Sequence, residues 1–223
     1  MSRAYRPQND VIYQVFYKNL DIIKFIFHYF FMGRKAYFKH EEFIDAAIQI
    51  IAKDGLGALT IAALAKRINA PVGSVYHRFP SRDALLAGLW LDIIESFQNE
   101  FLNILREDGL KSILSCLKWV RTHPNEAKIM LLYRLEDLTS GQWPKDLQKR
   151  ASRLTKELHE ATVSFTEKQF GSITKENTDR VIFALHDAPI GIFRRYLRSN
   201  KIPPESVADL LRETYEAIIE KAK

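Results

Sequence analysis

Apolar residues recur at helical spacing from Glu42 almost to the end of the chain. Residues 44, 47, 48 and 51 are the first such set, and residues three and four apart lie on one face of a helix. A second set, residues 61–68, begins after Thr60 and is only about two and a half turns long. The pattern therefore predicts a buried helix followed by a short one.

The later part of the chain has longer segments with the same period and no sustained alternation of the strand type. Their lengths are typical of helix bundles, and they span about 82–106, 145–170, 174–198 and 204–222. We therefore predict an all-α protein in two parts, with short helices in the N-terminal part and a C-terminal helical bundle after them. The predicted divisions are an extension of uncertain status at 1–31, a domain of short helices at 32–84 and the helical bundle at 85–223.

The short segments are separated by residues that end and start helices. Gly55 follows the first helix, and the hydroxyl of Thr60 is suited to cap the second. Asn69 tolerates a left-handed conformation, and Pro71 suits a first helical turn. Two short helices joined by three residues form a helix-turn-helix.

The third helix carries little apolar surface. Val75 and Phe79, four residues apart, are predicted to face the core, while the side chains between them face outward. Gly73 is a poor choice for a surface helix, since glycine costs about 1 kcal/mol relative to alanine. A glycine makes sense where another backbone comes close, as in the major groove of DNA.

The charge distribution bears on the possible binding partners, and the cysteine content bears on the cellular compartment. The net charge is +6, and residues 1–89 carry 12 basic against 7 acidic side chains, whereas residues 90–223 carry 21 against 20. A basic segment joined to a nearly neutral one fits a module for nucleic acid or an anionic surface, with surface solubility as the alternative. Cys116 is the only cysteine, so no internal disulfide is possible and a cytoplasmic setting is expected.

Residues 10–31 form an aromatic-rich apolar stretch. Polar residues near its middle, among them Lys18, Asp21 and Lys24, argue against a membrane span, and no small-residue cleavage site follows it. Three interpretations remain: an amphipathic helix docking on the body or a partner, a weak membrane-surface segment, or translated sequence ahead of a start at Met32.

Residues 43–86, FIDAAIQIIAKDGLGALTIAALAKRINAPVGSVYHRFPSRDALL, resemble the DNA-binding domain of the TetR family of bacterial transcriptional regulators. The positions that carry the resemblance are Gly55, Thr60, Ala65, Gly73, Ser74, Val75, Tyr76, Phe79, Ser81 and Leu85. Asn69 stands where the family usually has glycine, Pro71 where it often has a serine cap, and Arg82 where it usually has lysine. The histidine that commonly precedes the aromatic is replaced by Arg78, with His77 one residue earlier.

The resemblance implies that 32–84 is an N-terminal three-helix helix-turn-helix DNA-binding domain and that 85–223 is a C-terminal helical ligand-binding, regulatory and dimerisation domain. The expected DNA-binding residues are Lys39, Thr60, Pro71, Val72, Gly73, Ser74, Tyr76, His77, Arg78 and Arg82. Among them, Val72, Gly73 and Ser74 are expected to reach bases, and the polar and basic side chains to contact phosphates. Thr60 could instead be a purely structural cap, Tyr76 a half-buried aromatic and Arg78 a solvated charge.

The resemblance also implies a homodimer and a small-molecule effector of unknown identity. Two recognition helices at fixed separation are needed to read two half-sites, and the last two long helices are the expected interface. Expected interface residues are Ile190, Phe193, Leu197, Leu210 and Leu211. Candidate cavity residues, each of which could be ordinary core, are Phe97, Phe101, Trp119, Met130, Tyr133, Trp143, Phe165 and His186.

Enzymatic function finds no support in the sequence. It contains no Gly-rich phosphate loop, no HExxH motif and no paired-cysteine metal site, so no catalytic residue, metal or cofactor is expected. The sequence thus predicts a ligand-responsive, homodimeric repressor that binds double-stranded operator DNA. The alternative is a helical ligand-binding or membrane-surface interaction protein without operator binding, although a membrane partner is not expected.

Overall fold

The computed structural model describes residues 38–133 and 143–221, and every regular element within these ranges is helical, as predicted. His40–Lys223 forms one compact unit. The elements are α2 (His40–Asp54), a 3₁₀ turn (Leu56–Ala58), α3 (Ile61–Arg67), α4 (Val72–Arg78), α5 (Arg82–Leu105), α6 (Gly109–Thr122), α7 (Pro124–Leu132), α9 (Lys145–Phe170), α10 (Lys175–Ile182), a π-helical turn (Phe183–Asp187), α11 (Ala188–Arg198), α12 (Val207–Tyr215) and a second π-helical turn (Glu216–Glu220).

The helix starts follow the predicted caps. The Thr60 hydroxyl accepts a hydrogen bond from the Ala63 amide at 3.0 Å, and the Ser81 hydroxyl accepts one from the Ala84 amide at 3.0 Å. Each bond pairs an amide that the first turn of a helix would otherwise leave without a partner. Asp108 caps α6 in the same way, through Lys111 N at 2.9 Å.

A small apolar core joins α2, α3 and α4. Phe43, Leu64 and Val75 are almost completely buried, and Phe79 packs edge-on against Phe43 with ring centroids 5.9 Å apart. The predicted inward pair Val75 and Phe79 is confirmed. α2 also packs against α5 and α7, which connects this core to the rest of the unit.

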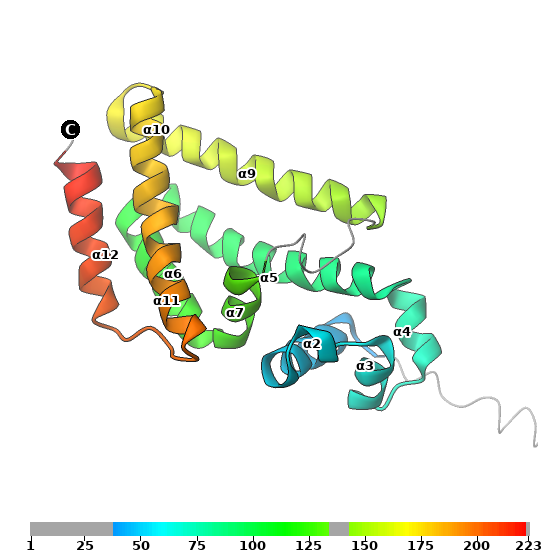
Figure 1. Ribbon diagram of the computed structural model, residues 1–223. Helices are drawn as coiled ribbons and strands as arrows, with labels where there is room; N and C mark the ends of the chain where they lie inside the picture. The colour runs from blue at the N-terminus through cyan, green and yellow to red at the C-terminus, as the bar shows by residue number, and fades with distance from the viewer. Residues whose placement is uncertain (1–37, 134–142, 222–223) are drawn as a thin grey trace, which may run out of the picture. The chain divides into compact units, whose positions relative to one another are not determined.

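The longer helices pack around α5 (Figure 1). α6 and α9 lie against α5, while α11 packs against α6 and α7. α10 contacts α9, and α12 packs against α6 and α11. The helix α5 runs from residue 82 to residue 105 across the predicted division at 84 and 85, so that division stays a prediction.

One predicted helix, 174–198, is interrupted. α10 and α11 follow each other, but the π-helical turn Phe183–Asp187 separates them. Pro189, the second residue of α11, has no N–H to donate to the carbonyl of residue 185, which favours a locally wider turn.

The N-terminal stretch at 10–31 lies outside the described residues. Within the described ranges, no helix is long and apolar enough to cross a membrane.

Candidate DNA-binding surface and internal cavity

The turn between α3 and α4 brings the two short helices together. Asn69 adopts the predicted left-handed conformation, with φ 54°, and the Ala70 amide donates to the carbonyl of Ala65 at 2.9 Å. Pro71 precedes α4 rather than lying within its first turn, and its carbonyl accepts from the Ser74 amide at 2.9 Å. This corrects the predicted place of Pro71 by one position.

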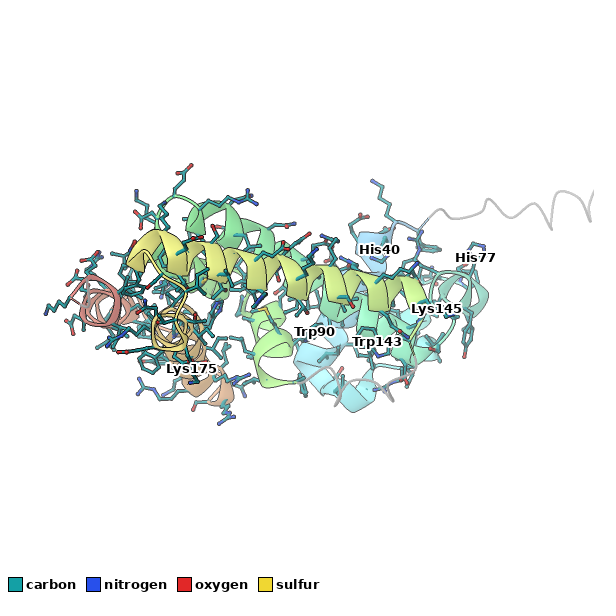
Figure 2. The ribbon with its side chains drawn as sticks, turned by 90° about the horizontal axis from the view of Figure 1, so that it is seen from above. His40, His77, Trp90, Trp143, Lys145 and Lys175 are labelled. Atoms are coloured by element: carbon teal, nitrogen blue, oxygen red, sulfur yellow. The ribbon has the colours of Figure 1, made fainter. Side chains whose placement is uncertain are left out.

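The outer face of α4 is a ridge of exposed residues, Pro71, Val72, Gly73, Tyr76 and His77, which we call the α4 ridge. Val72 is 45% exposed and Tyr76 is 53% exposed, although both are large and apolar or aromatic. Figure 2 shows His77 on α4 and Lys175 at the opposite end of the unit. Ser74 is half-buried at the edge of the ridge.

Gly73 is not required by the packing of the protein itself. A Cβ atom built on it would meet no atom within 4 Å, and its backbone is ordinary helix. A glycine that the interior does not need, at an exposed position where it weakens the helix, indicates a close approach from outside the chain.

Arg82 has a different environment from the one predicted. Its Nε donates to the Leu59 carbonyl at 2.7 Å and its Nη2 to the Leu56 carbonyl at 2.9 Å. These bonds hold the 3₁₀ turn ahead of α3, because Arg82 begins α5 directly beside that turn. The structure therefore gives Arg82 an internal bracing role, and its phosphate contact stays a prediction.

The other predicted phosphate contacts are exposed residues at or beside the ends of helices α2, α3 and α4. Thr60 is exposed and acts as the helix cap, so its phosphate role stays a prediction. The Arg78 guanidinium lies over the Phe43 ring, 5.6 Å from the centroid, and remains exposed. Lys39 is exposed just ahead of α2.

A cavity of about 500 Å³ lies among α5, α6, α7, α9 and α11, and its lining is mostly apolar. Five predicted cavity residues line it, namely Phe97, Phe101, Met130, Tyr133 and His186. Trp119 packs edge-on against Phe97, with ring centroids 5.1 Å apart, and supports the wall from behind.

Two predicted cavity residues lie elsewhere. Phe165 packs where α6, α9 and α12 meet, and a Cβ on Gly109 would come within 2.5 Å of its ring. Gly109 is thus needed to admit Phe165, whose role is in the core. Trp143 immediately precedes the start of α9, where its carbonyl accepts from Gln148 Nε2 at 2.9 Å.

The sequence analysis missed Trp90 and the α9 wall. Trp90 lines the cavity and begins a row with Ile94, Phe97 and Phe101 along one face of α5. Leu154 and Leu158 supply the opposing face from α9. This spacing was visible in the sequence, but the same spacing marks any buried helix face.

His186 is the titratable group most affected by the cavity. Burial lowers its pKa below the ordinary 6.5, and the neighbouring Asp187 offsets this only in part. Its ring lies 5.7 Å from that of Phe101. The cavity therefore favours the neutral imidazole.

Three of the predicted interface residues are core residues of a single chain. Phe193, Leu197 and Leu211 are almost fully buried, and Phe193 and Ile190 line the cavity. The apolar spacing correctly placed these residues on a buried helix face. The same spacing occurs on a face buried within one chain and on a face that meets a second chain. Leu210 is 50% exposed, as an interface residue would be in one isolated chain.

An ion-pair network joins α2, α5 and α9. His40 Nε2 and Arg150 Nη1 each lie 2.7 Å from an Asp92 carboxylate oxygen, and Arg150 and Arg153 both contact Glu95. Partial burial alone would raise the pKa of Glu95, but hydrogen bonds from the two arginines lower it overall. The charges come from positions over 50 residues apart, so the sequence offered no local signal for the network.

No group of three or more His, Cys, Asp or Glu suitable for a metal ion occurs within the described ranges. Burial raises the pKa of the Cys116 thiol well above its usual range, so this cysteine is a buried apolar residue.

Comparison with known proteins agrees with this geometry. Residues 43–89 match the family model described as bacterial regulatory proteins, tetR family. A curated relative, the HTH-type nicotine-responsive transcriptional repressor HdnoR of Paenarthrobacter nicotinovorans, is 21% identical over 162 residues, which are 67% of this chain and 80% of the relative.

Solved structures of regulators share the fold. A transcriptional regulator of Rhodococcus sp. Rha1 aligns with TM-score 0.63 and 19% identity, over 81% of this chain and 96% of that one. The regulator FadR of Bacillus subtilis, solved with stearoyl-CoA, aligns with TM-score 0.56 and 15% identity, over 81% and 98%. All three are named as transcriptional regulators or repressors. Residues 43–89 thus match the domain described for bacterial regulatory proteins of the tetR family, within an all-helical fold that the chain shares with solved transcription regulators.

Proposed function

We propose that the chain is a cytoplasmic, homodimeric repressor that binds operator DNA through the α4 ridge and releases it when a small molecule occupies the cavity. The observation that carries this proposal is the ridge itself. Its apolar and aromatic side chains are exposed, and Gly73 leaves space that no atom of the described residues fills.

On DNA, α4 enters the major groove with its N-terminal end toward the bases. Val72 offers apolar contact to a thymine methyl group, and Ser74 a hydroxyl that can donate or accept. Tyr76 and His77 then reach phosphates at the groove edge, which positions the helix without specifying sequence.

A second copy covers the exposed apolar residues near the C-terminus. Ile182 and Phe183 on α10 and the adjoining π-helical turn are exposed, and so is Leu210 on α12. We call these three residues the α10–α12 face. Its position on the last helices supports a two-fold dimer, which presents two α4 ridges to two half-sites.

Ligand response needs a path from the cavity to α2 and α4. α7 supplies Met130 and Tyr133 to the cavity and packs against α2. α9 supplies Leu154 to the cavity, and Arg150, one turn earlier, shares Asp92 with His40 at the start of α2. A ligand that displaces α7 or α9 would shift the balance between two orientations of the DNA-binding helices.

The relatives support a small-molecule effector but do not identify it. One is named for its response to nicotine and another was solved with stearoyl-CoA, two chemically different molecules. The identity of this chain's effector thus has to come from its own cavity.

The test begins with selection of bound duplexes from genomic fragments, using the full chain. Fluorescence anisotropy then measures affinity for the selected fragment across a salt titration. Tyr76→Phe should weaken binding with little change in the free energy of unfolding, because it removes one phosphate hydrogen bond. The control His159→Gln, an exposed change on α9, should bind like the wild type.

Two outcomes would contradict the proposal. If no duplex is enriched even at low salt, the alternative of a ligand-binding protein without operator binding is favoured. If Tyr76→Phe retains wild-type affinity and salt dependence, the phosphate role of Tyr76 is wrong.

A further inference from the structure

One permanently charged side chain lies in the wall of the mostly apolar cavity. Among the described residues that line the cavity, Arg194 is the only arginine or lysine, and no aspartate or glutamate is present. His186 adds no charge at neutral pH, because burial lowers its pKa below 6.5. The described lining therefore carries one positive charge and no negative charge to balance it.

The guanidinium of Arg194 is held at the end of α7. Its Nε donates to the Leu131 carbonyl at 2.7 Å, and Leu131 also lines the cavity. Within the described part of the chain, Arg194 takes part in no ion pair and its Nη groups make no hydrogen bond. Both Nη groups therefore keep their donors for a ligand, while the bond to Leu131 fixes their position.

Tyr133 adds a hydroxyl to the same wall. It follows Leu131 by two residues and lines the cavity directly after α7. A phenol hydroxyl can donate to an anion, so it can add a hydrogen bond to those of the guanidinium. Gln98 contributes differently, because its Nε2 already donates to the Leu154 carbonyl at 2.7 Å and joins α5 to α9.

The cavity has an apolar interior and a charged mouth. Arg194 lines it although the residue is exposed, which places the guanidinium where the cavity meets solvent. Leu91, Phe101 and Leu154 also line the cavity and are almost completely buried. An anion at the mouth keeps part of its hydration, whereas a charge buried in the apolar interior would be costly.

On the basis of the proposed ligand response, we propose that the effector is an apolar monocarboxylate whose carboxylate pairs with Arg194 and Tyr133. Its apolar body lies against Phe97, Phe101 and Leu154, in a volume that is usual for small-molecule sites. A planar carboxylate matches the paired N–H groups of a guanidinium, and its single charge matches the single cation. A cationic ligand would meet the Arg194 charge and no carboxylate among the described lining residues.

Matched probes separate the charge from the apolar contact. 4-Phenylbutanoate and 4-phenylbutanamide share an apolar body and differ in charge, and octanoate and octanamide form a second pair. Isothermal titration of the full chain at neutral pH should show that at least one acid binds about five- to tenfold more tightly than its amide, the effect of charge-assisted hydrogen bonds at a partly solvated site. The cations 4-phenylbutylamine and octylamine should bind more weakly than the matching amides.

Removal of the cation should abolish the acid preference. In Arg194→Gln, the acid and its amide should bind within about twofold of each other. The matched control is Arg195→Gln, because the guanidinium of Arg195 lies over the ring of Tyr196 and the residue is not among the described lining. This control should keep the wild-type preference.

Two further measurements do not depend on the loss of Arg194. Tyr133→Phe should weaken binding of the acid about two- to fivefold and leave binding of the amide unchanged, because it removes one hydrogen bond. In the wild type, the acid preference should fall as salt is added, since Arg194 is exposed and its charge is screened. Thermal unfolding checks that each variant is folded.

The inference is overturned if the wild type prefers neither acid, if no probe binds, or if the preference persists in folded Arg194→Gln. An equal loss of preference in Arg195→Gln would also overturn it, because general surface charge would then explain the effect. Failure of the proposed function gives a different result: the Arg194-dependent preference is present, but the selected duplexes show no binding or no response to the acid. Operator binding without any acid preference in the wild type would disprove this inference alone.

Discussion

A substitution at Gly73 should change the stability of the protein and its affinity for DNA in opposite directions. Gly73→Ala should raise the free energy of unfolding by about 1 kcal/mol, because alanine favours a helix and the new methyl group meets no atom within 4 Å. The same methyl group should weaken operator binding by holding α4 away from the bases. Urea unfolding and operator anisotropy measure the two effects.

A matched control exists in the same chain. Gly191 lies in α11 and also has no atom within 4 Å of an added Cβ. Gly191→Ala should bring a similar gain in stability while leaving operator affinity at the wild-type value. If Gly73→Ala binds the operator as well as Gly191→Ala does, α4 does not approach DNA closely at residue 73.

His186 should make the protein less stable in acid. Its folded-state pKa lies below 6.5, so the unfolded chain binds more protons and stability rises with pH across this range. The contribution is fully present above about pH 6.5 and is lost as the pH falls toward the lowered folded-state value. His186→Gln should remove this part of the acid loss.

Urea unfolding at a series of pH values from neutral to acid provides the measurement. His159→Gln, a change at an exposed histidine of α9, serves as the control and should keep the wild-type acid loss. A His186→Gln profile parallel to that of the wild type would show that burial does not affect this imidazole.

Features set by neighbouring residues could be predicted from the sequence. The cap at Thr60, the left-handed Asn69 and the inward face of Val75 each depend on a few local positions. The bonds of Arg82 and the unpaired N–H of Trp90 could not, because both depend on which distant backbone lies nearby.

At the scale of elements, Arg150 joins α9 to α5. Its side chain is 26% exposed and bonds both Asp92 and Glu95, whereas the side chain of Arg153 is 48% exposed. Arg150→Met should lower the free energy of unfolding by about 1–3 kcal/mol, since two partly buried carboxylates lose a shared partner. Arg153→Met, the matched control, should lower it by less, because exposed ion pairs contribute little to stability.

The ion-pair network that joins α2, α5 and α9 should also transmit ligand binding from the cavity to the DNA-binding helices. Because Asp92 also holds His40 at the start of α2, Arg150→Met should reduce the change in operator affinity that an effector produces. Operator anisotropy in the absence and in the presence of a saturating effector measures this change in affinity. If the effector changes the operator affinity of Arg150→Met as much as that of the wild type, the contact between α7 and α2 transmits ligand binding instead.

Helix order was predictable, and helix partners were not. The segments 82–106 and 145–170 match α5 and α9 closely, because periodicity and caps define a helix locally. The face of each helix that meets another chain was misjudged at Phe193, Leu197 and Leu211, since burial within one chain gives the same pattern.

For the whole molecule, the α10–α12 face decides whether the proposed repressor is a dimer. Phe183 is 46% exposed although it is large and apolar, and Ile182 beside it is exposed as well. Phe183→Glu places a charge in this face, and burying unpaired charges at a two-fold contact is strongly unfavourable. We expect the variant to sediment as a monomer at concentrations at which the wild type is a dimer.

Loss of the dimer should remove the preference for two half-sites. Each copy should still bind one half-site, because its α4 ridge stays intact. The wild type should bind a two-half-site duplex more than about tenfold more tightly than a single half-site, since both ridges are held at one separation. Phe183→Glu should bind the two duplexes with nearly equal, weak affinity. Ile202→Glu, at an exposed apolar residue in the loop between α11 and α12, should retain both the dimer and the preference. A Phe183→Glu variant that remains dimeric would place the interface elsewhere, and a monomeric wild type that still prefers two half-sites would show that the pairing of copies occurs only on DNA.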